Sequence, residues 1–402
     1  MTDPNSPLIP KRILIRSVNW LGDAIMTLPA LTALKETFPT AKLLLLTPQK
    51  LAGLWEKQPL FDKIISFDKK DSLLKTVRSI KSLKADSALI LPNSPRTAME
   101  TYLGKIPLRA GIHAKWRKLL LTHAFSSRTK ISLMKKRSLQ EISALSSCNC
   151  DSLPTKSPFL PGSHHIYHYI YLVSKFIQIF TGTPLDQNTL DLTPKLSLSR
   201  EEQQLAIQKF GISYPSLLPL MGVNAGAEYG PAKRWPIENF AQTMILLTQQ
   251  QKAHWIIFGG PNDINLAEVL QKQLQIQCPE MKVYNVAGKT SLRELLLLSG
   301  LTQIFLTNDT GPMHAAAAVG ATVAVPFLST SPELTSPGAP LESKTFPNSH
   351  ILLKPNHSFC SPCFLRKCPI DFRCARQITP EIMVSKITAF LKKSNSQSNI
   401  FA

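Results

Sequence analysis

The sequence lacks the long apolar run that a membrane-spanning helix requires. Its longest uncharged apolar stretch, about residues 313–328, is interrupted by His314, Gly320 and Pro326, and it is shorter than the roughly 20 residues that cross a bilayer. Residues 1–10 are polar and broken by proline, without the basic and apolar regions of a secretory signal. We therefore expect a cytoplasmic protein.

Motifs that would indicate other enzyme classes are absent too. The chain has neither a P-loop nor a G-x-G-x-x-G sequence, which argues against an ATPase or a dehydrogenase. It also has no Asp-x-Asp pair, so we expect no metal ion clamping a diphosphate and no cofactor.

Acidic residues are scarce, above all in the first half of the chain. The net charge is +20, of which residues 1–190 supply +15, and residues 101–140 contain no acid. The positive electrostatic potential of such a region attracts a polyanion, which could be nucleic acid, an anionic membrane face or a phosphorylated glycolipid. Aromatic residues near this basic run are few (Trp116 and Phe125), which argues against stacking of nucleic-acid bases. Solubilising charge on exposed faces is the alternative.

Apolar runs in the first half alternate with a helical pattern. Strands are expected at residues 12–15, 43–47, 63–67 and 88–91, and residues 24–38 carry apolar side chains at helical spacing. Fully apolar strands separated by helices predict a parallel sheet that is covered on both faces. This pattern is typical of a Rossmann-like unit.

A second alternation follows residues 181–199, a segment with three glycine and proline breakers that reads as a linker. Strands are expected at 218–224, 254–258, 283–286, 304–307 and 322–327, and helices at 237–250 and 264–275. The sequence therefore predicts an α/β protein with two Rossmann-like domains, residues 1–187 and 188–402, and a ligand cleft between them. We expect the C-terminal helix to pack back on the first domain.

The first candidate site segment is Asn19-Trp-Leu-Gly-Asp23, directly after the first expected strand. Gly22 can adopt backbone conformations that other residues avoid. Asp23 then falls in the first turn of a helix, where its carboxylate could remove a proton from a hydroxyl group. Alternatively, Asp23 is only a helix-start residue that the helix dipole favours.

The second candidate segment, Asn224–Pro236 (NAGAEYGPAKRWP), joins a strand to a helix. Small residues such as Gly226 let the backbone approach a ligand closely. Lys233 and Arg234, placed before a helix N-terminus, suit a diphosphate. A basic surface loop is the alternative.

The third segment, LTNDTGPMH over residues 306–314, opens a helix of small residues. Asp309 can accept hydrogen bonds from sugar hydroxyls, whereas Thr310, Gly311 and His314 can donate to phosphate. A helix cap with an uninvolved histidine is the alternative.

These segments, in this order and spacing, resemble the family 9 glycosyltransferases, the ADP-heptose:lipopolysaccharide heptosyltransferases. GAEYGPAKRWP (226–236) and TNDTGPMH (307–314) are long enough to be specific, and the heptosyltransferase II members of the family are the most similar. NWLGD (19–23), PNS (92–94) and GKIPLRAG (104–111) match as well. The resemblance extends from about residue 12 to residue 391.

The resemblance implies a fold of the GT-B class and an inverting enzyme. It implies ADP-heptose as the donor and the lipid A–core as the acceptor at the inner membrane face, with peripheral membrane association and no nucleic acid partner. Asp23 falls on the catalytic base of the family, Lys233 on the lysine that contacts the diphosphate, and Asp309 on the aspartate that holds the heptose. The remaining donor contacts fall on Gly226, Asp263, Thr310, Gly311 and His314.

Acceptor contacts are expected in the basic first half of the chain. The candidates are Asn93, Arg109, Lys115, Arg117 and Lys118. The last four are expected to grip the phosphate and carboxylate groups of the acceptor.

Four of the seven cysteines (Cys360, Cys363, Cys368 and Cys374) lie close together in the sequence. In a cytosolic protein this clustering argues against disulfides. The spacing matches no common zinc finger, so a structural metal ion and reduced thiols in a loop are both open. We expect reduced thiols.

Other functions compete with heptose transfer from ADP-heptose to the inner-core heptose. These are a heptosyltransferase for another core position, another nucleotide-sugar enzyme such as an epimerase, and a non-catalytic binder of anionic glycolipid. The joint presence of Asp23, Lys233 and Asp309 favours the transferase.

Overall fold

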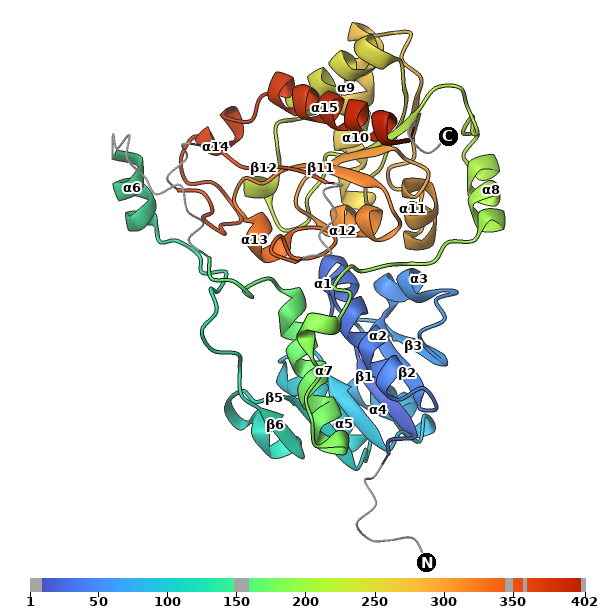
Figure 1. Ribbon diagram of the computed structural model, residues 1–402, viewed down its shortest axis with the longest axis vertical. Coiled ribbons are helices and arrows are strands. Elements are labelled where there is room, and N and C mark those ends of the chain that lie inside the picture. The colour runs from blue at the N-terminus through green and yellow to red at the C-terminus, as the bar shows by residue number, and fades with distance from the viewer. Residues whose placement is uncertain (1–8, 148–158, 344–349, 357–359, 399–402) are drawn as a thin grey trace, which may run out of the picture. The chain divides into compact units, whose positions relative to one another are not determined.

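The structure is a computed structural model that describes residues 9–147, 159–343, 350–356 and 360–398. Its chain forms two compact units (Figure 1). The first contains the described residues up to Ile131 together with Leu160–Ser197. The second contains Leu198–Glu342, the segment that begins at Ser132, and the C-terminal part of the chain. The unit boundary at Ser197 lies ten residues beyond the one proposed from the sequence.

The first unit is built on a parallel sheet of six strands in the order β3-β2-β1-β4-β5-β6. Its strands are β1 (Arg12–Arg16), β2 (Lys42–Pro48), β3 (Lys63–Phe67), β4 (Ser87–Ile90), β5 (Leu108–Ile112) and β6 (His123–Phe125). Its helices are α1 (Leu21–Met26), α2 (Leu28–Thr37), α3 (Ala52–Trp55), α4 (Leu73–Ser82), α5 (Pro95–Leu103) and α7 (Ile166–Thr181), and a 3-10 helix, η2 (Lys115–Leu120), follows β5. β1 is buried almost throughout because helices cover both faces of the sheet.

The second unit repeats this plan with the sheet order β12-β11-β10-β7-β8-β9, again with parallel pairs only. Its strands are β7 (Leu220–Asn224), β8 (His254–Ile257), β9 (Val283–Asn285), β10 (Ile304–Thr307), β11 (Thr322–Pro326) and β12 (Ile351–Leu353). Its helices are α6 (Leu139–Ser147), α8 (Arg200–Lys209), α9 (Ile237–Gln251), α10 (Ile264–Gln277), α11 (Leu292–Ser299), α12 (Gly311–Ala318), α13 (Pro332–Thr335), α14 (Arg373–Arg376) and α15 (Pro380–Ser398).

Both sheets have the 3-2-1-4-5-6 strand order of the Rossmann fold, counted within each unit. The prediction of two Rossmann-like α/β domains is therefore confirmed. No helix among the described residues is long and apolar enough to cross a membrane.

One local expectation needs correction. The single helix expected at 24–38 is two helices, α1 and α2, which meet at Thr27. Pro29 has no N–H to continue the hydrogen bonds of α1, so α1 ends and a new helix, α2, begins with Pro29 in its first turn. The C-terminal helix α15 contacts α9 and adds Met383, Val384 and Ile387 to the core of the second unit.

Candidate active site

The predicted site segments follow the two strands at the centre of each sheet. In a Rossmann sheet the strand order reverses at that point, and ligands bind outside the carboxyl ends of the strands there. In the first unit β1 and β4 flank this point; β1 leads into α1, which carries Asp23, and β4 leads into the loop that carries Asn93. In the second unit β7 and β10 flank it, and they lead into the loops that carry Lys233 and Asp309.

Asp23 lies in the first turn of α1, as predicted. The chain is still extended at Trp20 and becomes helical at Leu21, so α1 begins there. The side chain of Trp20 makes no cap hydrogen bond. A carboxylate at this position interacts favourably with the positive end of the helix dipole. The Asp23 side chain is 23% exposed, so it is ordered by the fold and still reachable.

Two side chains from the start of α7 contact this carboxylate. The Tyr169 hydroxyl donates to Asp23 Oδ1 over 3.1 Å, and His165 Nδ1 lies 3.2 Å from the same oxygen. Tyr169 is 4% exposed, and burial together with Asp23 raises its pKa well above 10. The phenol therefore stays protonated and can only donate to Asp23. The sequence does not predict these partners, because nothing local links residues 165–169 to residue 23.

His168 completes this cluster and carries little charge at neutral pH. Burial, with smaller contributions from His165 and Arg128, lowers its pKa to about 4 against an opposite effect of Asp23. A neutral His168 therefore places no positive charge beside the Asp23 carboxylate.

The lowered pKa of His168 predicts a loss of stability in acid. The unfolded chain binds a proton at this histidine below pH 6.5, whereas the folded chain does so only near pH 4. Stability should therefore fall as the pH drops from 6.5 to 4, by at most about 3 kcal/mol from this group. Urea unfolding at pH 7, 5 and 4 should show a shallower decline for His168→Gln than for the wild type. Equal slopes for the two proteins would contradict this assignment.

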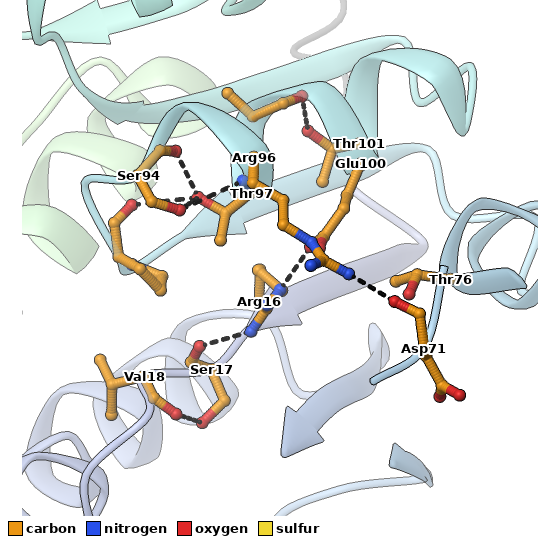
Figure 2. Close-up of polar contacts among 12 residues, drawn as sticks. Arg16, Ser17, Val18, Asp71, Thr76, Ser94, Arg96, Thr97, Glu100 and Thr101 are labelled. Carbon is orange, nitrogen blue, oxygen red and sulfur yellow. Dashed lines mark hydrogen bonds and ion pairs between the residues drawn. The ribbon is translucent and has the colours of Figure 1, made fainter. Parts of the chain in front are cut away.

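A buried ion pair fixes the backbone that leads to Asp23 (Figure 2). Arg16, at the end of β1, places its Nε 2.8 Å from Oε2 of Glu100 on α5, and the two side chains are 3% and 0% exposed. Arg16 Nη1 also donates to the carbonyl of Ser17 over 2.9 Å. Arg96 holds the second oxygen of Glu100 at 3.1 Å. The pair thus ties the loop after β1 to the helix after β4.

The predicted acceptor residues separate into exposed and structural ones. Asn93 and Lys118 are exposed, and the side chain of Lys115 lies outside the described part of the structure. Arg117 is fully buried and donates to the carbonyls of Ile112 and Pro92. Arg117 therefore holds η2 to the body of the unit, and its contact with the acceptor stays a prediction.

Arg109 is also engaged by the fold. Its Nε donates to the carbonyl of Leu120 over 2.9 Å, its Nη1 donates to that of Ile106, and its guanidinium lies 5.4 Å from the Tyr102 ring. Burial lowers the pKa of Arg109. This side chain holds η2 against α5, and its Nε and Nη1 already donate to backbone carbonyls.

In the second unit, Asn308 ties the two predicted donor loops together. Its Nδ2 donates to the carbonyl of Ala225 over 2.8 Å, and its Oδ1 accepts from the backbone N–H of Trp235 over 2.9 Å. Asn308 is fully buried. The loop after β7 and the loop after β10 are therefore positioned as one assembly.

Lys233 and Asp309 meet in this assembly. Lys233 Nζ lies 2.8 Å from Asp309 Oδ2 and 3.1 Å from the Asp309 carbonyl oxygen, with side chains that are 15% and 4% exposed. The sequence predicted both residues as donor contacts but not their pairing. Because the lysine charge is fixed at a single place, it is preorganised for an incoming anion.

Close backbone approach requires the two glycines of the first donor loop. A Cβ on Gly226 would lie 2.4 Å from the Asp263 carboxylate, and one on Gly230 would lie 2.4 Å from the carbonyl oxygen of Arg366. Asp263 Oδ2 accepts from the N–H of Gly260 over 3.1 Å. The predicted donor contacts Gly226 and Asp263 are thus in contact with each other.

The remaining predicted donor residues lie at the start of α12. Thr310 precedes the helix in an extended conformation, Gly311 is its first residue, and His314 is buried at 5% exposure. Pro312 has no N–H and the Met313 N–H donates to the Thr310 carbonyl over 3.0 Å, so this end of the helix offers a negatively charged group the Gly311 N–H and the positive end of the helix dipole.

The four clustered cysteines line one small cavity together with Ile142 and Ile370. Cys363, Cys368 and Cys374 are free thiols, and Cys360, Cys363 and Cys374 are buried. Burial raises the pKa of Cys374 to about 12, with the neighbouring cysteines adding to the shift, so this thiol stays protonated. Metal ions bind the thiolate. Within the described ranges, no group of three or more His, Cys, Asp or Glu is arranged to hold a metal ion.

The family model for glycosyltransferase family 9 (heptosyltransferase) matches residues 120–371, well over half of the chain. The chain belongs to glycosyltransferase family 9. It is therefore a glycosyltransferase, as the sequence resemblance implied.

Individual family 9 proteins match most of the chain. Lipooligosaccharide heptosyltransferase 2 of Haemophilus influenzae is 28% identical over 333 residues, covering 81% of this chain and 85% of that protein. The protein of the same name from Campylobacter jejuni is 25% identical, covering 96% and 99%. The structure of E. coli ADP-heptose lps heptosyltransferase II superposes with a TM-score of 0.71 at 22% identity, covering 96% and 99%. This family 9 structure confirms the GT-B class of the fold.

Proposed function

We propose that this chain is an inverting heptosyltransferase that moves a heptose from ADP-heptose to a heptose of the lipopolysaccharide inner core, as heptosyltransferase II does. The observation that supports the proposal is a carboxylate at the switch point of one sheet and a lysine–aspartate pair at the switch point of the other. Asp23 follows β1, and Lys233 and Asp309 follow β7 and β10, each at the switch point of its sheet.

The second unit is the proposed donor-binding unit. The diphosphate of ADP-heptose is bound by Lys233 and by the N-terminal end of α12, where Thr310, Gly311 and His314 lie. Asp309 accepts hydrogen bonds from the heptose hydroxyls while it keeps Lys233 in place. Negative charge grows on the diphosphate as it departs, and these groups are already positioned to stabilise it.

The first unit is the proposed acceptor-binding unit. The acceptor hydroxyl attacks the anomeric carbon on the face opposite ADP, the bond from that carbon to the diphosphate oxygen breaks, and Asp23 takes the hydroxyl proton. Tyr169 and His165 hold the carboxylate for this step. Asn93 and Lys118, both exposed, remain the proposed acceptor contacts, together with Lys115, three residues before Lys118 in the sequence.

A product assay tests the reaction. The purified chain is incubated with ADP-heptose and a series of truncated core acceptors, and ADP release and acceptor mass are both measured. We expect ADP release only with acceptors that end in the inner-core heptose, together with an increase in acceptor mass of one heptose. Transfer to another core position would change the acceptor assignment, and nucleotide release without any acceptor would contradict the function.

Replacing Lys233 with alanine should weaken donor binding and slow turnover. The cation is lost, and the buried Asp309 carboxylate is left without its partner, so it repels the diphosphate. Lys233→Arg should restore the charge but only part of the rate, because a planar guanidinium does not reproduce the contact of an ammonium group. Calorimetric titration with ADP-heptose measures the affinity. An unchanged Kd in the alanine variant would remove Lys233 from the donor site.

A further inference from the structure

The described surface of the first unit contains an exposed apolar area where α5 meets η2. Tyr102 and Leu103, at the end of α5, are 48% and 37% exposed, and Trp116 and Leu119, on η2, are 50% and 83% exposed. The two elements are in contact. We call these four residues, together with the exposed Lys105 and Lys118, the α5–η2 face.

The fold holds this face rigidly. Arg117 is buried beneath η2 and donates to carbonyls in β5 and in the loop after β4. Arg109 lies on the Tyr102 ring and donates to the carbonyl of Leu120 at the end of η2. Two cations thus attach η2 to the body of the unit while Trp116 and Leu119 point outward. A preorganised surface loses little conformational entropy when it binds.

The charge around the face selects the kind of partner. Residues 101–140 contain no acid, and the preceding Glu100 is buried against Arg16. Lys105 and Lys118 therefore carry positive charge beside the apolar side chains with no acidic residue in this stretch of sequence to offset it. Tryptophan and tyrosine favour the interface between lipid headgroups and acyl chains, and lysine is attracted to anionic lipids.

We propose that the α5–η2 face binds the surface of an anionic phospholipid bilayer, with Trp116 and Leu119 in the headgroup region. The idea extends the proposed function, in which the acceptor is a lipid. Arg117 connects η2 to the Pro92 carbonyl, directly before the predicted acceptor contact Asn93. Docking through η2 therefore brings the loop of Asn93 to the membrane surface.

Vesicle co-sedimentation of the full chain, without donor or acceptor, tests the binding. Two kinds of vesicle are compared: phosphatidylcholine alone, and phosphatidylcholine mixed with about 30% of the anionic lipid phosphatidylglycerol. We expect binding to the anionic vesicles that weakens at high salt. Trp116→Ser/Leu119→Ser should reduce the partition coefficient by at least about 10-fold. Lys105→Glu/Lys118→Glu should remove the preference for anionic vesicles, since each lysine contributes about fivefold.

Matched controls come from apolar residues that are equally exposed elsewhere. Leu205 and Ile276, 65% and 80% exposed on helices of the second unit, are replaced together by serine and should leave vesicle binding unchanged. Quenching of tryptophan fluorescence by brominated lipid should be lost in Trp116→Phe and kept in Trp20→Phe, whose side chain is 52% exposed. Equal binding by the serine variants of both surfaces would overturn the proposal. The proposal would also be overturned if the wild type forms dimers and only Trp116→Ser/Leu119→Ser abolishes them. The α5–η2 face would then bind a second copy of the chain.

The failure of this inference and that of the proposed function are distinguishable. Transfer to a deacylated, water-soluble acceptor should be the same in Trp116→Ser/Leu119→Ser as in the wild type, whereas transfer to acceptor embedded in vesicles should fall. If the wild type transfers no heptose to the soluble acceptor, the proposed function fails, and vesicle binding alone decides the role of the α5–η2 face.

Discussion

Asp23→Asn should lower kcat by roughly a hundred- to ten-thousand-fold, the usual cost of losing a general base. The substitution preserves the shape of the side chain, and an amide oxygen can still accept the hydrogen bond that Tyr169 donates to Oδ1 over 3.1 Å. What disappears is the ability to take a proton from the acceptor hydroxyl. Steady-state transfer rates at saturating donor and acceptor measure the effect.

The matched control is Tyr169→Phe, which removes one hydrogen bond from Asp23 and keeps the base. It should slow transfer far less than Asp23→Asn. The Kd for ADP-heptose should be unchanged in both variants, because the proposed donor contacts come from the loops after β7 and β10 in the second unit. If the Asp23→Asn variant keeps more than half of the wild-type kcat, Asp23 has no part in the mechanism.

The parts of the fold that the sequence predicts are those that local patterns determine. β2 and β10 are apolar runs that end at turn residues, and α9 begins after a proline within one residue of its predicted bounds. Such segments are buried on both faces wherever they lie in a parallel sheet, so composition alone indicates them. β6 and β12 have only three residues each, too short for any periodicity to show.

Burial of charge could not be predicted in the same way. Within the sequence KWRKLL, Arg117 resembles its neighbouring lysines, yet it is buried and bonded to two carbonyls, while Lys118 is exposed. The difference depends on acceptors at Ile112 and Pro92, which only the folded chain brings close. A count of basic residues therefore predicts the charge of this region but does not distinguish a buried arginine from an exposed lysine.

The candidate site shows the same division between local and distant information. The position of Asp23 in the first turn of α1 follows from the strand-to-helix transition around it. Its contacts with His165 and Tyr169, and the pairing of Lys233 with Asp309, join residues 76 to 146 positions apart. No single-sequence pattern encodes such pairs, because each forms only when segments far apart in the chain meet at one edge of a sheet.

Glu100→Ala should destabilise the protein by about 3–5 kcal/mol, the cost of breaking a buried ion pair by removing one partner. Arg16 would be left with its guanidinium 3% exposed and without the carboxylate that lies 2.8 Å from its Nε. Burial already lowers the pKa of Arg16, and Glu100 is what opposes this shift. The free energy of unfolding in urea at neutral pH measures the loss.

Three further variants separate the pair from its surroundings. Arg96→Ala, which removes the 48% exposed partner of Glu100, should cost no more than about 1 kcal/mol. Arg16→Met/Glu100→Leu removes both buried charges and should recover most of the stability. Glu100→Gln retains a side chain of the same shape, so a folded variant should show lower kcat with unchanged donor Kd, because Arg16 holds the Ser17 carbonyl on the way to Asp23. If the stability of Glu100→Ala lies within about 1 kcal/mol of the wild type, well below the cost of a broken buried pair, the pair neither stabilises the first unit nor fixes the loop of Asp23.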